Sequence, residues 1–184
     1  DLYSHVEVAK KVISKLDYDF NKELVYVAAQ GPDPMYYNVF AKDSKDYRFY
    51  ADRMHDTNTG MLLTHMTQYV KKHLTVDTYS FLIGFITHYA LDSTIHPYIY
   101  YHVGDYKESD PSTHHTRGLH LKFERSIDAV LIEEDTKKKA HKISLHKSHF
   151  TLKELPEEVS KIMGYALKQT YGKDNGAEMF NIAV

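Results

Sequence analysis

Residues 79–96 form the longest apolar segment with helical spacing, and this segment constrains the fold more than any other. We expect a buried helix here, capped at its N-terminus by Asp77 and ended or kinked by Pro97. Polar residues interrupt the segment at intervals of four, which places them along one helix face: His88, Asp92 and His96. Because buried polar groups are costly unless they are paired, these three side chains need partners inside the protein.

The rest of the chain shows helical periodicity and almost no strand signal. Residues 36–56 combine aromatic and charged side chains without a clear period, so we expect a long loop with short helical pieces there. The apolar residues 177–184 either dock on the core or lead into a C-terminal part that has been truncated. The sequence therefore predicts an all-α, multi-helix bundle in a single domain spanning residues 1–184. Its further helices are expected at residues 4–16, 21–29, 59–73, 116–138 and 157–171.

Composition limits both the chemistry and the partners. The chain has 13 histidines and no cysteine, so nitrogen and oxygen are the available metal ligands. The formal net charge is -2, so the chain has no overall positive charge that would attract nucleic acid. The sequence also contains no run of about 18 apolar residues, so we expect no transmembrane segment. No signal sequence is visible, so we expect a cytoplasmic protein, or a secreted one if a signal was removed. Nothing in the sequence indicates the oligomeric state.

Candidate ligands also occur outside residues 79–96. His120 and Glu124 are four residues apart on a predicted helix, Asp33 lies between two prolines, His55 precedes an aspartate, and His5 begins the first helix. Each has an ordinary structural explanation when taken alone: a solvated helix face, a turn or a helix end. The histidines and aspartate of residues 79–96 could likewise form a hydrogen-bond network inside a helical bundle.

Taken together, these residues indicate a metal centre. Histidine and carboxylate pairs at four-residue spacing on facing helices are how helical bundles build polynuclear sites in their cores. Calcium would require mostly oxygen ligands, so the histidine content favours zinc or a similar transition metal.

The ordered set of motifs resembles the zinc-dependent phospholipase C family of bacteria, which shares its all-helical fold with the fungal zinc-dependent single-strand nucleases. The resemblance covers residues 4–130. In chain order, the motifs that support it are Ser4-His5-Val6, Asp33 with Tyr36-Tyr37, His55-Asp56-Thr57-Asn58-Thr59-Gly60, His88-Tyr89 with Asp92 and His96-Pro97, and His120 with Phe123-Glu124.

The resemblance implies two to three zinc ions. It assigns the first zinc to Asp33, His55, His88 and Asp92. It assigns the second zinc to His96, His120 and Glu124. A third would use His5 and the second oxygen of Asp92, together with the amino group and carbonyl of the N-terminal residue in secreted members. The chain departs from the family in lacking the N-terminal tryptophan and in a tighter Asp92–His96 spacing.

The implied activity is a zinc-dependent phosphoester hydrolase that uses metal-activated water, with Asp33 as the candidate general base. The expected substrate is a small phosphoester or a phospholipid, and the near-neutral charge disfavours nucleic acid. Two alternatives stay open: a metal-stabilised helical module without catalysis, and a nuclease-type phosphodiesterase. Candidates for a substrate wall are Tyr36, Tyr37 and Phe40, whereas Tyr98, Tyr100 and Tyr101 are expected to pack in the core at a helix end. We assign to the surface or to loops His65, His73, His102, His114, His115, His141, His146 and His149.

Overall fold

The computed structural model describes residues 1–38 and 44–183, and all regular structure in these ranges is helical. The predicted all-α class is therefore confirmed. The helices are α1 (Leu2–Ile13), α2 (Lys22–Ala28), α3 (Ser44–Asp56), α4 (Thr59–Lys72), α5 (Val76–Val103), α6 (Leu119–Thr136), α7 (Leu145–His149), α8 (Glu157–Tyr171) and α9 (Gly176–Ala183), with short 3-10 turns η1 (Asp33–Tyr37), η2 (Pro111–Thr116) and η3 (Ala140–Lys142).

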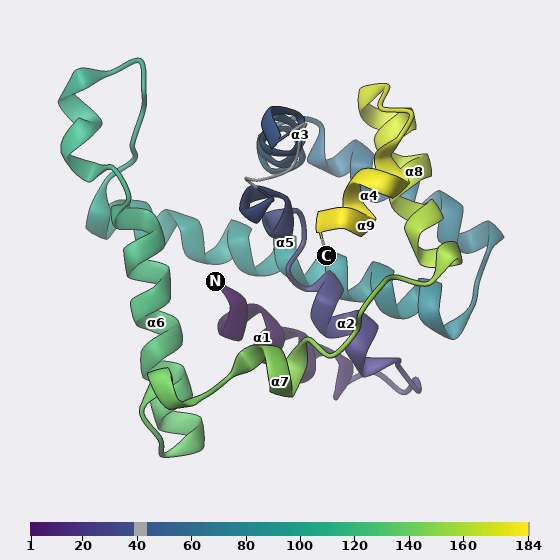
Figure 1. The fold of residues 1–184 in the computed structure, drawn as a ribbon, viewed down its shortest axis with the longest axis horizontal. Coiled ribbons are helices and arrows are strands. Elements are labelled where there is room, and N and C mark those ends of the chain that lie inside the picture. The colour runs from purple at the N-terminus through teal and green to yellow at the C-terminus, as the bar shows by residue number, and fades with distance from the viewer. Residues whose placement is uncertain (39–43, 184) are drawn as a thin grey trace.

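Helix α5 crosses the molecule and organises the other helices (Figure 1). It contacts α1, α2, α4, α6 and α8, and α6 crosses it near its C-terminal end. The main core lies where α5 packs with α2, α4, α8 and α9, and a smaller cluster fills the space beneath α1. Polar side chains on the C-terminal half of α5 can therefore meet side chains from several other helices.

The structure corrects the predicted N-cap of α5 and excludes one of the two outcomes expected at Pro97. Thr75, and not Asp77, is the N-cap, because Thr75 and Thr78 exchange side-chain hydrogen bonds with each other's backbone amide in a capping box. Pro97 does not end the helix, which continues to Val103. Pro97 and Ser93 are both exposed, so solvent can hydrate the Ser93 carbonyl that a normal amide would have bonded.

The loop predicted for residues 36–56 is also wrong, because α3 occupies thirteen residues of it. Its buried residues are Tyr47, Ala51 and Met54, whose spacing of four and three forms one apolar stripe. The surrounding charged and aromatic residues obscured this stripe in the sequence. Phe40, expected in a substrate wall, lies outside the described residues.

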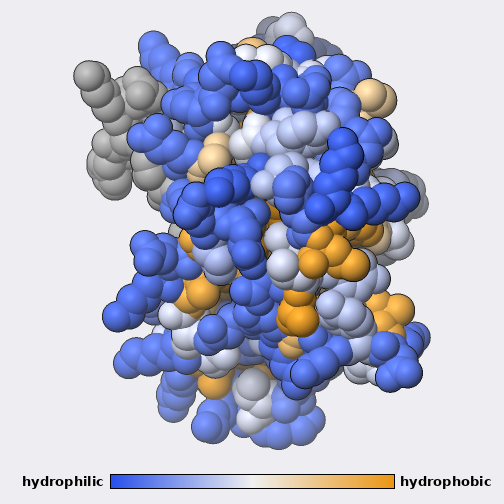
Figure 2. All heavy atoms as spheres, turned by 90° about the vertical axis from the view of Figure 1, so that its right-hand side faces the viewer, coloured by the Kyte–Doolittle hydropathy of each residue, from blue (hydrophilic) through white to orange (hydrophobic). Residues whose placement is uncertain are grey.

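The C-terminal residues dock on the core. Helix α9 packs against α8 and η1, and Phe180 contacts the rings of Phe81 and Phe85 on α5. On the face that carries α8 and the α4–α5 connection, hydrophilic side chains predominate and hydrophobic ones form small patches (Figure 2). Leu74 and Val76 on this connection are among the exposed apolar residues. Several aromatic side chains line a cleft between α3, α5 and α6: Tyr36, Tyr37, Phe49, Tyr89, Tyr100 and Tyr106.

Helix α2 packs closely against α5, and this packing places the backbone at the end of α2 beside His88. A Cβ atom on Gly84 would lie 2.4 Å from the Val25 carbonyl oxygen, so only glycine permits this approach. The same packing brings the end of α2 next to His88. A Cβ atom on Gly31, which has φ of +55°, would lie 2.3 Å from the His88 ring.

Candidate metal centre

His88 and Asp92 of α5 form the buried base of the cleft. One helical turn separates them, and His88 Nε2 lies 3.1 Å from Asp92 Oδ2. On the other side of the ring, His88 Nδ1 is 3.2 Å from the Ala29 carbonyl oxygen. A carbonyl can only accept, so Nδ1 carries the proton and Nε2 presents its lone pair to the cleft.

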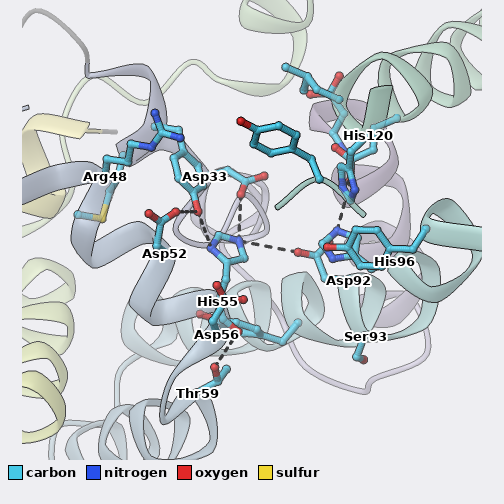
Figure 3. A pocket seen from close by; sticks show the side chains of 18 of the residues that line it. Asp33, Arg48, Asp52, His55, Asp56, Thr59, Asp92, Ser93, His96 and His120 are labelled. Carbon is cyan, nitrogen blue, oxygen red and sulfur yellow. Dashed lines mark hydrogen bonds and ion pairs between the residues drawn. The ribbon is translucent and has the colours of Figure 1, made fainter. Parts of the chain in front are cut away.

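Helix α3 and the turn η1 bring a second histidine and a second carboxylate to the same place. His55 Nε2 lies 3.2 Å from Asp33 Oδ1 and 3.4 Å from His88 Nε2. His55 Nδ1 is 2.8 Å from the Ala51 carbonyl oxygen, so Nδ1 carries a proton and Nε2 is the atom that faces Asp33 and His88. Ligand atoms of Asp33, His55 and His88 all lie within 4.8 Å of one another, as a shared metal ion requires. Figure 3 shows Asp33 and His55 of this group facing each other.

His5 reaches this cluster from α1. Its Nε2 atom lies 3.4 Å from Asp92 Oδ1, and its ring stacks on His88 with centroids 4.6 Å apart. His5, His88 and Asp92 form a second group whose ligand atoms lie within 4.8 Å of one another. The two groups share His88, and Asp92 presents its two oxygens to different histidines.

The third group lies further along α5, where α6 crosses it. His120 and Glu124 of α6 pair at 3.1 Å, and His96 Nε2 lies 3.4 Å from the same Glu124 oxygen. Asp92 joins this group to the others, because its Oδ1 atom is 3.6 Å from His96 Nε2. The amino group of Asp1 lies 3.8 Å from Glu124 Oε2.

The structure thus brings all eight predicted ligands into one region, in three neighbouring groups, two of which share His88. Family resemblance had placed Asp92 in the first zinc site, and in the structure its Oδ2 atom lies 3.9 Å from His55 Nε2. The histidines assigned to the surface or to loops do not belong to these groups within the described residues. Whether each of the eight binds a metal stays a prediction.

Two buried ligand atoms lack hydrogen-bond partners among the described residues: Asp92 Oδ1 and His5 Nδ1. Unpaired polar atoms are costly in a protein interior. The Nε2 atoms of His55 and His88 also converge, 3.4 Å apart. A cation bound among these imidazole nitrogens and carboxylate oxygens would satisfy these atoms, so the residues present fit zinc.

Electrostatics keep the carboxylates charged and one histidine neutral. Burial opposes ionisation of Asp92 and Glu124, but hydrogen bonds from histidines hold the pKa of each carboxyl well below its usual range. Burial lowers the pKa of His5 to about 3, and the neighbouring His88 adds to this effect. Ionised carboxylates and a neutral imidazole are the protonation states that metal ligands need.

His55 and His96 behave in the opposite way. Burial lowers the pKa of each ring, but hydrogen bonds to Asp33 and to Glu124 raise it more, so both pKa values lie above the usual histidine value. These two histidines hold protons that a metal ion would have to displace.

The cleft above the ligands has a volume of about 1580 Å³. Tyr36 and Tyr37 line it, as the sequence predicted for a substrate wall. The expectation that the tyrosines near the end of α5 pack in the core is wrong: Tyr100 lines the cleft, while Tyr98 and Tyr101 are 53% and 84% exposed. An exposed helix end, where α5 extends past Pro97, explains this difference.

Sequence reasoning missed several residues of α3 that line the cleft. Lys45, Arg48 and Asp52 lie on the same helix face as His55, at spacings of three or four. Asp52 accepts a hydrogen bond of 2.8 Å from the Tyr36 hydroxyl, and the Tyr36 ring stacks on His55. Their periodicity was the available signal, but it lay in a segment interpreted as a loop.

Comparison with known proteins agrees with this geometry. A model of the zinc-dependent phospholipase C family matches residues 4–171, nearly the whole chain. The chain therefore belongs to the zinc-dependent phospholipase C family, and the match extends beyond the residues 4–130 that carry recognisable motifs. Searches of curated proteins and of solved structures gave no significant match. No helix within the described residues is both long and apolar enough to cross a membrane.

Proposed function

We propose that this protein hydrolyses a phosphodiester as a phospholipase C does, at a centre of two to three zinc ions within one helical domain of residues 1–184. The convergence of histidine and carboxylate ligand atoms in three neighbouring groups is the observation that supports this proposal best. Family membership supports the choice of zinc and of a lipid substrate.

The proposed assignment of ligands is the one that the family resemblance implies, and the grouping of their atoms supports it. One ion would be held by Asp33, His55, His88 and Asp92, and a second by His96, His120 and Glu124. A third would use His5 and the remaining oxygen of Asp92. When bound, zinc supplies positive charge for phosphoryl oxygens and lowers the pKa of water toward neutrality. Eight ligands cannot fill about twelve positions of three tetrahedral ions, which leaves positions for water or substrate.

Asp33 is the proposed general base. Its side chain is more exposed to the cleft than that of Asp92, so a water molecule in the cleft can reach it. Burial opposes its ionisation, but the hydrogen bond from His55 and the charge of nearby imidazoles lower its pKa. Asp33 is therefore ionised at neutral pH and can accept a proton from the attacking water.

The walls of the cleft suit a lipid. Tyr36, Tyr37, Phe49, Leu63 and Ile86 contribute apolar surface to the same cleft that contains the ligands. The volume of about 1580 Å³ exceeds the roughly 300–1,000 Å³ of common small-molecule sites. Such a space fits the glycerol end of a phospholipid better than a small phosphate ester.

Hydrolysis of p-nitrophenyl phosphocholine by purified protein tests this proposal. We expect turnover that is lost on chelation and restored by zinc, together with two to three zinc ions per chain in elemental analysis. Phosphatidylcholine vesicles should release diacylglycerol. If the fully metallated protein hydrolyses no phosphodiester, phosphomonoester or phospholipid, the enzyme proposal is wrong and a metal-stabilised module is the better account.

A further inference from the structure

Two cationic side chains line the cleft without a partner. Lys45 and Arg48 of α3 are the lysine and arginine side chains that border it within the described residues, and both are exposed. Neither forms an ion pair or hydrogen bond to any described residue. The next arginine of α3, Arg53, instead lies over the rings of Phe49 and Tyr171.

These cations have a defined position relative to the candidate metal centre. Arg48 precedes His55 by seven residues on the same helix, which corresponds to about two turns or ~10 Å along the axis. In Figure 3, Arg48, Asp52 and His55 lie on the side of the pocket away from His96 and His120. A substrate whose scissile phosphate lies at the ligands would therefore extend another group toward Arg48.

The carboxylates of the cleft leave this positive charge available. Asp33, Asp92 and Glu124 pair with histidines. Asp1, Asp56 and Asp105 also line the cleft, and none of them forms an ion pair with Lys45 or Arg48 among the described residues. Asp52, one turn from Arg48, accepts a hydrogen bond from the Tyr36 hydroxyl. Its carboxylate lies beyond ion-pair distance of the Arg48 guanidinium. Uncompensated cations in a cleft attract anions, and the guanidinium fork matches a phosphate in two hydrogen bonds.

We propose that Lys45 and Arg48 form a second anion subsite, which selects a phospholipid whose headgroup carries its own phosphate. The inference rests on the proposed function. In the reaction, water attacks the diester phosphorus and the bond from phosphorus to the glycerol oxygen breaks. Diacylglycerol leaves with a proton, and the headgroup is released with two phosphate groups.

The alternative polyanion, a nucleic acid, fits less well. Only two cations line the cleft within the described residues, and the net charge of the chain is -2. A nucleic acid site requires basic residues along the whole strand path. The aromatic and aliphatic side chains that also line the cleft instead suit the apolar part of a lipid.

The test compares dioctanoyl phosphatidylinositol 4-phosphate with dioctanoyl phosphatidylinositol, both as monomers, on zinc-loaded protein. We expect kcat/KM to be about 10-fold higher for the phosphorylated lipid. In the double variant Lys45→Gln/Arg48→Gln this ratio should fall close to one. The control Lys71→Gln/Lys72→Gln removes the same charge from exposed positions at the end of α4 and should keep the wild-type ratio.

Other outcomes are equally decisive. Equal kcat/KM for the two lipids in wild-type protein, or an unchanged ratio in the double variant, would overturn the subsite while leaving the proposed hydrolase intact. Preferential cleavage of a single-stranded oligonucleotide, lost in the double variant, would also overturn it. Equal cleavage of deacylated glycerophosphoinositol 4-phosphate would support the subsite and assign it to a water-soluble diester.

Binding separates this inference from catalysis. Calorimetry of zinc-loaded protein should show tighter binding of inositol 1,4-bisphosphate than of inositol 1-phosphate, by about 10-fold, with the difference lost in the double variant. If no substrate is hydrolysed but this binding difference is present, the hydrolase proposal fails and the anion subsite stands. If binding is equal, the subsite is wrong whatever the activity.

Discussion

The Nε2 atoms of His55 and His88 lie 3.4 Å apart, while the Nδ1 atom of each ring faces a backbone carbonyl oxygen. With Nδ1 protonated in both rings, two lone pairs face each other across this gap unless one ring takes up a second proton. The hydrogen bond to Asp33 raises the pKa of His55, so this ring favours a second proton in the absence of metal. A zinc ion replaces that proton with a stronger positive charge, and this exchange leads to the first prediction.

Zinc binding near pH 6.5 should release protons from His55 and His96. Burial lowers the pKa of both rings, but hydrogen bonds to Asp33 and Glu124 raise it above the usual 6.5, so both are largely protonated at this pH. Zinc requires the neutral ring. Titration calorimetry in buffers with different ionisation enthalpies measures the release, which should shrink at pH 8.5. Equal release at both pH values would contradict the raised pKa values.

The substitution Asp92→Ala should lower both the zinc content and the free energy of unfolding. Asp92 lies within 4.0 Å of four histidines, and its removal leaves them facing one another without a counter-charge. We expect at least one zinc ion fewer per chain and a loss of about 3–5 kcal/mol in the free energy of unfolding, as for broken buried ion pairs. Chemical denaturation and elemental analysis measure the two effects. The control Asp174→Ala breaks an exposed pair with Lys168 and should change stability by about 1 kcal/mol or less.

Asp33→Asn distinguishes a general base from a simple ligand. The substitution nearly preserves shape while removing the basic oxygen and one negative charge. If Asp33 is the base, turnover should fall by about 10²–10⁴-fold while the zinc held by His96, His120 and Glu124 is retained. Activity and zinc content measured on the same samples provide the comparison. A parallel fall of both would assign Asp33 the role of ligand alone.

Gly31→Ala should disturb the centre without changing any ligand. The added Cβ would lie 2.3 Å from the His88 ring, and the φ of +55° disfavours any side chain. We expect lower zinc affinity in addition to a strain of about 1–2 kcal/mol. Gly172→Ala is a matched control, because Gly172 also has positive φ but has open space around its Cβ position. Equal zinc affinity in the two variants would show that Gly31 does not position His88.

The zinc-free protein should lose stability as the pH falls from about 6.5 toward 4.5. His5 stays neutral in the folded protein down to a pKa of about 3, whereas the unfolded chain takes up this proton near pH 6.5. The unfolded state binds more protons in this window, so the free energy of unfolding rises with pH by up to about 1.4 kcal/mol per unit. His55 and His96 contribute little below about pH 5.5, where they are protonated in both states, but closer to pH 6.5 they oppose this slope, because the unfolded chain loses protons that the folded protein keeps.

Urea denaturation of chelator-treated protein between pH 4.5 and 6.5 measures this slope. The variant His5→Gln lacks the titrating ring and should show a flatter profile. A profile in wild-type protein that is independent of pH across this window would contradict a buried, neutral His5. Below about pH 4.5, Asp92 and Glu124 should steepen the loss, because their lowered pKa values act in the same direction.

Local spacing in the sequence determined the helical class and the two ligand pairs that lie within single helices. His88 and Asp92, like His120 and Glu124, share a helix face because four residues complete about one turn, whatever the rest of the fold does. The order of the metal-binding motifs also identified the family. These features depend only on neighbouring residues, which is why they could be predicted.

Tertiary packing alone decided which of these groups meet. His5 and His55 come from α1 and α3, and only the tertiary fold brings them to the two oxygens of Asp92 on α5. The same packing stabilised α3 through its buried stripe of Tyr47, Ala51 and Met54, although its local pattern favoured a loop. It also left Lys45 and Arg48 facing the cleft. Contacts between distant segments depend on burial of apolar surface across the whole molecule, and no single stretch of sequence contains that information.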